Sequence, residues 1–362
     1  MRRLTIAAPL LAVAVAGTLS AAPVQAGTGR PVPGMDNCAA NACHFDVPPG
    51  TYDVRVRLGG GAAASTSIGG ETRRSLLPET ATEAGRPVTR GFTVNVRTPE
   101  GEPTGPEGTP GLDLVIGGSA PALAGIRVTP AATREAGSGR PADGRIRTRQ
   151  IFLVGDSTVC DQPGDPYSGW GQQLPQYFRK GLSVANYADS GESTVTYLAD
   201  PALFPTVQPL IRAHDLVLIQ LAHNDKTTDE PTYRANLETL VAGVRARGGE
   251  PVLVTPIVRR WFNADGTLDN GTALLVNGLG VDLPAVIRSV AATEDVPLID
   301  LTAKTKALVE SLGPEGSKAV YLYDEKRDNT HTSVHGATVY AALVRDELLA
   351  LRLVPRGLVR VG

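Results

Sequence analysis

The pattern of apolar residues changes near residue 148 of this 362-residue chain. After that point, short apolar runs alternate with segments in which apolar residues recur every three or four positions. Such runs are typical of strands buried on both faces of a parallel sheet, and the intervening periodicity predicts helices. The predicted strands are Ile151–Val154, Ser183–Asn186, Leu216–Leu221, Pro251–Thr255 and Val296–Leu301. Strands and helices in alternation predict a doubly wound parallel α/β domain over residues 148–362.

Residues 27–147 show a different pattern, in which apolar and polar residues alternate between Gly-, Pro- and Thr-containing turns. This alternation predicts antiparallel strands and a small all-β sandwich domain. The predicted strands are Tyr52–Leu58, Gly91–Arg97, Leu112–Ile116 and Leu123–Val128. Phe45, Tyr52 and Phe92 fall at expected core positions, so few aromatic side chains are left to stack on a sugar ring. A galactose-binding-like domain and a spacer domain therefore both stay open. Residues 129–147, rich in Ala, Gly, Pro and Arg, predict a linker between the domains.

The first residues predict export of the protein. Arg2 and Arg3 precede an apolar run, Leu4–Leu19, and small residues follow at Val24–Ala26. This arrangement is typical of a signal peptide, here residues 1–26, and predicts a secreted protein. A membrane anchor is the alternative, but the run is short and is interrupted by proline and glycine.

Charge and cysteine content narrow the possible partners. The chain has 37 acidic and 35 basic residues, so we expect neither a nucleic-acid partner nor a membrane partner after signal cleavage.

The three cysteines are Cys38, Cys43 and Cys160. Cys38 and Cys43 are close enough in sequence to form a disulfide, a pairing that the sequence leaves open, and Cys160 is interpreted as a small buried residue. No Cys/His spacing suits zinc, and Asp161 with Asp165 lacks a further ligand, so no metal or cofactor is expected.

Polar residues follow the predicted strands where a parallel sheet places its ligand-binding crevice. Ser157 comes directly after the first strand, in the string Gly155-Asp156-Ser157. It is interpreted either as a helix N-cap or as a nucleophile. A nucleophilic serine needs a base and a group that orients the base, and His331 with Asp328 three residues earlier can supply both. A chance surface turn is the alternative interpretation of that pair.

Two further strand ends supply groups that could stabilise an oxyanion. The backbone N–H groups of Ser157 and Gly191 and the side-chain amide of Asn224 are the candidate donors, each worth about 3 kcal/mol in a dry site. Asp156 and Asp225 are expected to accept backbone N–H bonds around their turns. The sequence therefore predicts an oxyanion hole next to the candidate nucleophile.

Five strings in the second domain carry a resemblance to a known family, the SGNH (GDSL) hydrolases, and in particular to the rhamnogalacturonan acetylesterase group. The strings are GDSTVCDQ, SGWGQQLPQYF, NYADSGES, HNDKT and DNTHTSVHGA. The resemblance spans about residues 150–351, essentially the whole second domain. The resemblance implies a flavodoxin-like sheet, the triad and oxyanion hole named above, and no cofactor. Two-domain secreted members with an N-terminal sandwich also occur in the group.

The sequence departs from that group in places. Ala222 stands where relatives often have glycine, and residues 321–328 form a shorter segment than usual ahead of the D-x-x-H string. The α/β-hydrolase elbow G-x-S-x-G is absent, because Val159 occupies its last position. The shortened segment affects the expected shape of the substrate cleft rather than the chemistry.

By analogy with the group, the expected substrate is acetylated plant cell-wall polysaccharide, pectic rhamnogalacturonan first and xylan second. Trp170, His223, Arg259 and Arg260 are candidate substrate-binding residues, with Trp261 beside them, although Trp170 fits a core position equally well. A lipase or thioesterase of the same fold and a non-catalytic carbohydrate-binding protein stay open as alternatives.

Overall fold

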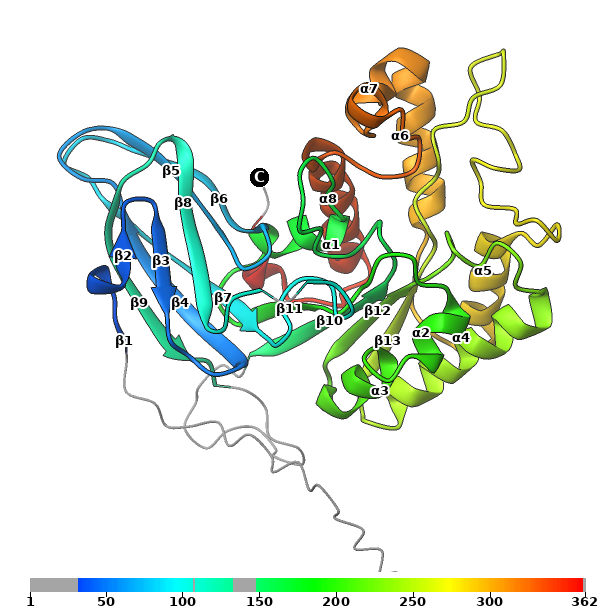
Figure 1. Cartoon of the computed structure of the whole chain (residues 1–362), viewed down its shortest axis with the longest axis horizontal. Coiled ribbons are helices and arrows are strands. Elements are labelled where there is room, and N and C mark those ends of the chain that lie inside the picture. Colours follow the sequence, from blue (N-terminus) through cyan, green and yellow to red (C-terminus); the bar gives the residue numbers. More distant parts are fainter. Residues whose placement is uncertain (1–31, 107, 133–147, 361–362) are drawn as a thin grey trace, which may run out of the picture.

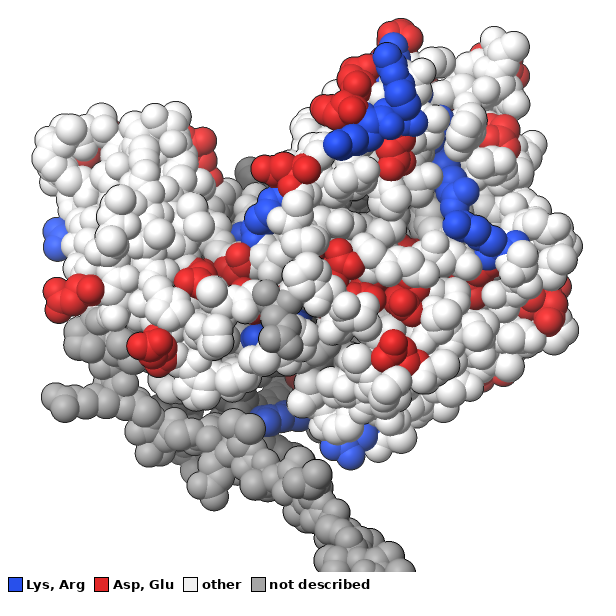
Figure 2. Space-filling view, in the orientation of Figure 1, with Lys and Arg blue, Asp and Glu red and all other residues white. Residues whose placement is uncertain are grey.

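The computed structural model describes residues 32–106, 108–132 and 148–360. These residues form an N-terminal all-β domain (32–132) and a C-terminal α/β domain (148–360) that lie side by side (Figure 1). The predicted signal peptide and most of the predicted linker fall outside the described residues. Acidic and basic side chains are interspersed on the face shown in Figure 2, and neither sign forms a continuous surface there.

The N-terminal domain consists of two antiparallel sheets packed face to face. One sheet has the strand order β1-β9-β4-β7 and the other β2-β3-β8-β5-β6. Their bounds are β1 (Val32–Pro33), β2 (Cys38–Ala39), β3 (Ala42–Phe45), β4 (Gly50–Leu58), β5 (Ala64–Gly70), β6 (Arg74–Thr82), β7 (Val88–Val96), β8 (Leu112–Ala120) and β9 (Leu123–Pro130). Phe45, Tyr52 and Phe92 are buried in the core between the sheets, as predicted. Cys38 and Cys43 form a disulfide.

The C-terminal domain is built on one parallel five-stranded sheet with the order β11-β10-β12-β13-β14. The strands are β10 (Arg149–Gly155), β11 (Leu182–Asn186), β12 (Leu216–Gln220), β13 (Glu250–Val254) and β14 (Leu298–Ile299). Numbered within the domain, this order is 2-1-3-4-5, the order of flavodoxin-like sheets. The predicted fold class is therefore confirmed. In such a sheet the chain leaves the first and third strands toward opposite faces, and ligands bind outside the carboxyl ends of these strands.

Helices cover both faces of this sheet (Figure 1). They are α1 (Trp170–Gln173), α2 (Thr194–Ala199), α3 (Phe204–Val207), α4 (Glu230–Arg245), α5 (Leu283–Thr293), α6 (Leu301–Gly316), α7 (Tyr323–Lys326) and α8 (Val334–Ala350). Short 3₁₀ turns lie at Met35–Asn37, Leu174–Tyr177, Gln208–Leu210, Ser317–Ala319 and Arg356–Leu358. Ile151 and Leu153 of β10 pack with α1, α6 and α8, whereas Phe152 and Val154 pack with α2 to α5. Both faces of β10 are buried, which explains its uninterrupted apolar run.

The two domains are joined along strand β11, the edge of the parallel sheet nearest the sandwich. The backbone N–H of Gly181 donates to the hydroxyl of Thr93 on β7 at 2.9 Å, and Arg360 donates to the carbonyl of Gly91 at 2.8 Å. Lys180 forms an ion pair with Asp53 of β4 at 3.1 Å. The sandwich thus packs closely against the α/β domain.

Candidate active site

Strand β10 ends in the turn that carries the candidate nucleophile. Asp156 is fully buried, and its carboxylate accepts hydrogen bonds from the backbone N–H and the hydroxyl of Thr158, at 2.9 and 2.7 Å. The carbonyl of Asp156 accepts bonds from the N–H groups of Val159 and Cys160. These bonds fix the turn and leave Ser157, between Asp156 and Thr158, partly exposed. Asp156 therefore accepts a backbone N–H bond, as predicted.

The second component is a tight turn between α7 and α8. The carboxylate of Asp328 accepts the backbone N–H groups of Thr330 and His331, at 2.7 and 3.0 Å, which folds the D-x-x-H segment onto itself. Arg327, at φ +55°, terminates α7 just before this turn. The α8 helix begins directly afterwards, capped by the hydroxyl of Ser333. The segment thus leaves the His331 imidazole at the carboxyl edge of the sheet.

The structure brings the three predicted residues together. Nε2 of His331 lies 2.9 Å from the Ser157 hydroxyl oxygen, and Nδ1 lies 2.7 Å from the Asp328 carboxylate. Partial burial opposes ionisation of Asp328, but hydrogen bonds from the imidazole and from two backbone N–H groups outweigh it and lower its pKa to about 2. An ionised carboxylate on Nδ1 holds the proton there and leaves Nε2 to accept one from Ser157. The geometry is that of an activated serine nucleophile.

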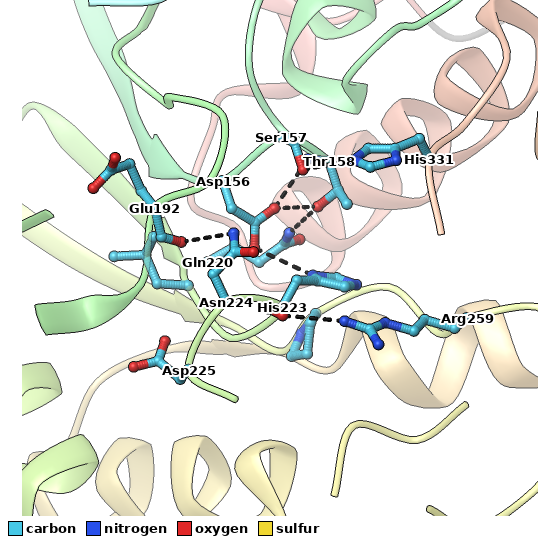
Figure 3. A network of polar contacts seen from close by, with 12 residues as sticks. Asp156, Ser157, Thr158, Glu192, Gln220, His223, Asn224, Asp225, Arg259 and His331 are labelled. Carbon is cyan, nitrogen blue, oxygen red and sulfur yellow. Dashed lines mark hydrogen bonds and ion pairs between the residues drawn. The ribbon is translucent and has the colours of Figure 1, made fainter. Parts of the chain in front are cut away.

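The candidate oxyanion donors Gly191 and Asn224 lie on the loops that follow β11 and β12, the two strands that flank β10 in the sheet. Gly191 has φ +87° and is exposed, and a Cβ placed on it would meet no atom within 4 Å. Its bare backbone therefore faces open space in a conformation that favours glycine. The side-chain amide of Asn224 donates one hydrogen to the carbonyl of Glu192 at 3.1 Å, and an amide nitrogen carries a second (Figure 3).

A buried pair of residues supports the floor of the site. His223 is 3% exposed, and its Nδ1 lies 3.2 Å from the Asp156 carboxylate (Figure 3). Burial opposes ionisation of Asp156, but this contact and the bonds from Thr158 lower its pKa. Asp225 accepts the backbone N–H of Thr194 at 3.0 Å, which connects the Asn224 loop to α2. The contact between Asp156 and His223 thus joins the loop that carries Ser157 to the loop that carries Asn224.

Three of the four candidate substrate-binding residues are buried. Trp170 is 1% exposed and donates its Nε1 hydrogen to Gln220 at 2.9 Å, so it packs in the core. Arg260 is 7% exposed and bonds to Ser317 and to the side chain and backbone of Asn329, which braces the D-x-x-H turn. His223 lies beneath the crevice, with an Nε2 that has no hydrogen-bond partner in the part of the chain that is described. None of the three presents an open surface to a substrate.

Arg259 does remain at the site. It donates from one terminal nitrogen to the carbonyl of His223 at 3.1 Å, and Figure 3 shows its guanidinium directed toward that residue. Its Nε has no hydrogen-bond partner within the described ranges. Burial lowers the pKa of Arg259, and the nearby carboxylates of Asp156 and Asp328 oppose that shift. Trp261, the next residue but one, is 48% exposed.

Several residues at the site were not predicted from the sequence. Gln162 donates to the carbonyl of Ser157 at 2.9 Å, and the ring of Tyr167 meets the His331 ring edge-on at 5.5 Å. Gln220 joins the Trp170 indole to the Thr158 hydroxyl. These contacts connect segments that are distant in sequence. The only indication of them in the sequence is that some of the residues, such as Gln162, fall within the family strings. Cys160 is buried and unpaired, as predicted.

Neither a metal site nor a membrane span is visible in the described ranges. No group of three or more His, Cys, Asp or Glu side chains in residues 32–106, 108–132 and 148–360 is arranged to hold a metal ion. Helices in those same ranges are too short or too polar to cross a bilayer.

Comparison with known proteins gives a consistent result. The family model described as GDSL-like Lipase/Acylhydrolase matches residues 153–339, about half of the chain. A rhamnogalacturonan acetylesterase of Bacillus subtilis (strain 168), RhgT, is 36% identical over 220 residues, which are 56% of this chain and 91% of the relative. A probable rhamnogalacturonan acetylesterase of that strain, YesY, is 32% identical over 214 residues, which are 56% of this chain and 94% of the relative.

One solved structure matches both domains. The crystal structure of YxiM from Bacillus subtilis superimposes with a TM-score of 0.52 at 25% identity, covering 86% of this chain and 81% of that one. In sequence, YxiM is described as an uncharacterized esterase and is 27% identical over 319 residues. The match therefore extends through the N-terminal domain as well as the α/β domain.

Proposed function

Because the chain belongs to the GDSL-like lipase/acylhydrolase family and is a carboxylic ester hydrolase, we propose that it removes O-acetyl groups from plant cell-wall polysaccharide. One observation carries this proposal: the His331 imidazole lies between Ser157 and Asp328, at 2.9 and 2.7 Å. The names of the relatives RhgT and YesY support an acetylated polysaccharide as the substrate class.

The reaction proceeds in two halves. The Ser157 oxygen attacks the acetyl carbonyl carbon while Nε2 of His331 takes the hydroxyl proton. The negative oxygen that forms is stabilised by the N–H groups of Ser157 and Gly191 and by the Asn224 amide. Collapse breaks the bond to the sugar oxygen, which receives the proton from His331, and leaves an acetyl ester on Ser157.

Water completes the cycle. His331 removes a proton from the water as its oxygen attacks the acetyl-enzyme, and then returns the proton to the Ser157 oxygen as acetic acid leaves. The acid then loses its remaining proton to the neutral solvent and becomes acetate. Asp328 stays ionised throughout, since its pKa of about 2 is far below neutral pH, and it stabilises the positive charge on the imidazole. The protein groups alone balance every proton up to the release of acetic acid.

Arg259 favours a pectic substrate over xylan. Its guanidinium contacts the carbonyl of His223 and lies near enough to Asp328 for the two charges to interact. It forms no ion pair within the described residues and is partly removed from water. A cation in such a place is stabilised by a carboxylate supplied from outside. Galacturonate units of rhamnogalacturonan carry that carboxylate, whereas the xylose backbone of xylan carries none. We therefore propose pectic rhamnogalacturonan as the first substrate.

Acetate release from a panel of acetylated polysaccharides tests this function. The chain is expected to deacetylate rhamnogalacturonan faster than xylan, and Arg259→Gln is expected to reduce that preference about tenfold, in line with one charge-assisted hydrogen bond. Activity on 4-nitrophenyl acetate, which has no carboxylate, should change little in this variant. Faster turnover of xylan by the wild-type chain would contradict the pectic assignment.

Chain-length preference separates an acetylesterase from a lipase or thioesterase. Rates on 4-nitrophenyl acetate and 4-nitrophenyl octanoate are to be compared at equal concentration. A preference for octanoate would overturn the acetyl assignment while leaving the triad in place. A carbohydrate-binding protein without catalysis would release acetate at the same rate with and without the Ser157 hydroxyl.

We also propose that the protein is secreted. The basic start, the apolar run and the small residues up to Ala26 support this, and the Cys38–Cys43 disulfide suits an oxidising compartment. N-terminal sequencing of protein recovered from the culture medium should begin at Gly27. Recovery of the full-length chain from inside the cell alone would contradict secretion.

A further inference from the structure

Two loops of the N-terminal domain contact segments that border the proposed reaction centre. The β5–β6 turn (71–73) contacts residues 160–167, which follow Ser157. The β7–β8 loop (97–111) contacts residues 187–191, which end at Gly191. The sandwich therefore meets the α/β domain on both sides of the site, and not only along strand β11.

The β7–β8 loop holds the backbone just ahead of Gly191. A carboxylate oxygen of Glu102 accepts the backbone N–H of Ser190 at 2.9 Å. Thr104 donates its backbone N–H at 3.2 Å, and also its hydroxyl, to the carboxylate of Asp189. The Ser190 N–H belongs to the planar Asp189–Ser190 peptide, which directly precedes the peptide carrying the Gly191 N–H, so holding it restricts where this oxyanion donor can lie. Gly191 has no side chain of its own to do so.

The β5–β6 turn holds the other side of the site. One terminal nitrogen of Arg73 donates to the carbonyls of Gln162 and Tyr167, at 3.0 and 2.9 Å, and the other pairs with Asp165. Gln162 in turn contacts the carbonyl of Ser157, and the Tyr167 ring packs on His331. A single sandwich arginine thus sets the loop that contacts the candidate nucleophile and its base.

A buried ionic cluster underlies both loops and keeps the domains together. Arg74 of β6 is 1% exposed and pairs with the fully buried Asp161 of the α/β domain at 2.5 Å. Arg97, 4% exposed, lies 3.4 Å from the same carboxylate. Separating such buried charges would leave them unpaired away from water, which is strongly unfavourable. The buried ion pairs therefore disfavour separation of the two domains.

From this arrangement we infer that the N-terminal sandwich is a structural part of the active site, in which Glu102 and Arg73 are positioning residues for hydrolysis. Glu102 holds the Asp189–Ser190 peptide, which directly precedes the one that presents the Gly191 N–H, and Arg73 holds the loop that contacts Ser157 and His331. The inference rests on the proposed function of the Ser157 site. It assigns the sandwich a role other than those of a spacer or a separate sugar-binding module.

Substitution of Glu102 tests the inference with 4-nitrophenyl acetate, a substrate too small to need a polysaccharide-binding surface. Glu102→Ala is expected to lower kcat about tenfold with KM within twofold, because a displaced oxyanion donor costs part of the 10²–10³-fold lost when one is removed. Glu102→Gln keeps an oxygen that can accept the Ser190 N–H and is expected to restore most of kcat.

Glu79→Ala is the matched control. Glu79 is an exposed sandwich carboxylate on β6 that also accepts a backbone N–H, that of Ser119 at 2.7 Å. Its loss should leave kcat and KM unchanged. A Glu102→Ala enzyme that melts like the wild type and keeps kcat within twofold would overturn the inference while leaving the proposed function intact.

Thr104→Val provides a second variant in case Glu102→Ala does not fold. It removes one hydroxyl donor to Asp189 and is expected to lower kcat about threefold at unchanged KM, since only one of two bonds from Thr104 is lost. Suppose that Glu102→Ala does not fold and that Thr104→Val and Glu102→Gln both keep the wild-type kcat. These contacts would then serve folding rather than hydrolysis, and the inference would be overturned. A wild-type chain inactive on every ester would overturn the function and the inference together.

Discussion

At the scale of single residues, the site depends on the charge of Asp328. Three hydrogen bonds, from the His331 ring and from the N–H groups of Thr330 and His331, hold this carboxylate ionised. The residue types and their order suggested this triad but left a helix cap and a chance turn open, and the resemblance to the SGNH hydrolases favoured the triad. Gln162 and Tyr167 were not predicted, because their roles come from contacts with residues far away in the chain and no local pattern marks them.

The pH profile follows from the Asp328 pKa. Because this pKa is lowered to about 2, Asp328 does not titrate in the working range, and a single group, the His331 imidazole, must lose its proton for activity. We expect log kcat/KM, plotted against pH, to fall with a slope of one as the pH decreases. A slope of two on the acid side would show that a second group must also lose a proton, which would contradict this expectation.

Asp328→Asn should lower kcat by about 10²–10⁴-fold, because the amide favours the wrong imidazole tautomer.

Gly191 is the second residue whose substitution is informative. Gly191→Ala would strain the backbone at φ +87° and place a methyl group in the open crevice, so kcat should fall at least tenfold. Gly266 has φ +82° and also faces open space, in a hairpin between Phe262 and Leu268. Gly266→Ala should therefore lower the melting temperature similarly without changing kcat. Equal activity of the two variants would remove Gly191 from the site.

At the scale of elements, the buried strands were predictable and the polar ones were not. The five strands of the parallel sheet appear as apolar runs because both of their faces are covered by helices. Strands β5 and β6 were missed because Ser, Thr, Gly and Pro residues interrupt their apolar pattern. Trp170 fitted a cleft and the core equally well from the sequence, and Arg260 was a cleft candidate on residue type. Both are buried, and burial depends on tertiary packing that the local sequence does not show.

Helix α8 supports the D-x-x-H turn through one close contact. A Cβ on Gly336 would lie 1.9 Å from the carbonyl oxygen of Val320, in the segment that leads to α7. Gly336→Ala should therefore push α8 away and destabilise the fold by about 2–3 kcal/mol, a decrease in melting temperature of roughly 5–10 °C. Gly316→Ala, where the nearest atom would be 3.4 Å away, is the control and should melt like the wild type. Equal melting of both variants would contradict this packing.

At the scale of the whole molecule, the buried surface between the domains couples stability to pH. Burial raises the pKa of Glu71, beside Arg74, to about 7, and neither carboxylate oxygen has a hydrogen-bond partner among the described residues. The folded protein therefore holds a proton that the unfolded chain releases at lower pH, so the stability contributed by this group decreases as the pH rises toward 7. Above pH 7, where Glu71 is ionised in both the folded and the unfolded protein, its contribution to the free energy of unfolding no longer changes with pH.

Glu71→Gln removes this titration. The melting temperature of the variant, relative to that of the wild type, should increase between pH 5 and pH 8, with most of the change below the folded pKa of about 7. Glu83→Gln, at an exposed surface residue of the same domain, should show no such trend. A difference between Glu71→Gln and wild type that is the same at both pH values would contradict the assigned protonation.

The most direct test of the central claim is acetate release from 4-nitrophenyl acetate by Ser157→Ala, measured beside the wild type at neutral pH with matched melting curves. We expect kcat to fall by about 10³-fold or more, because the base and the oxyanion donors remain but the nucleophile is gone. A folded Ser157→Ala protein that retains wild-type turnover would show that ester hydrolysis does not proceed through this serine.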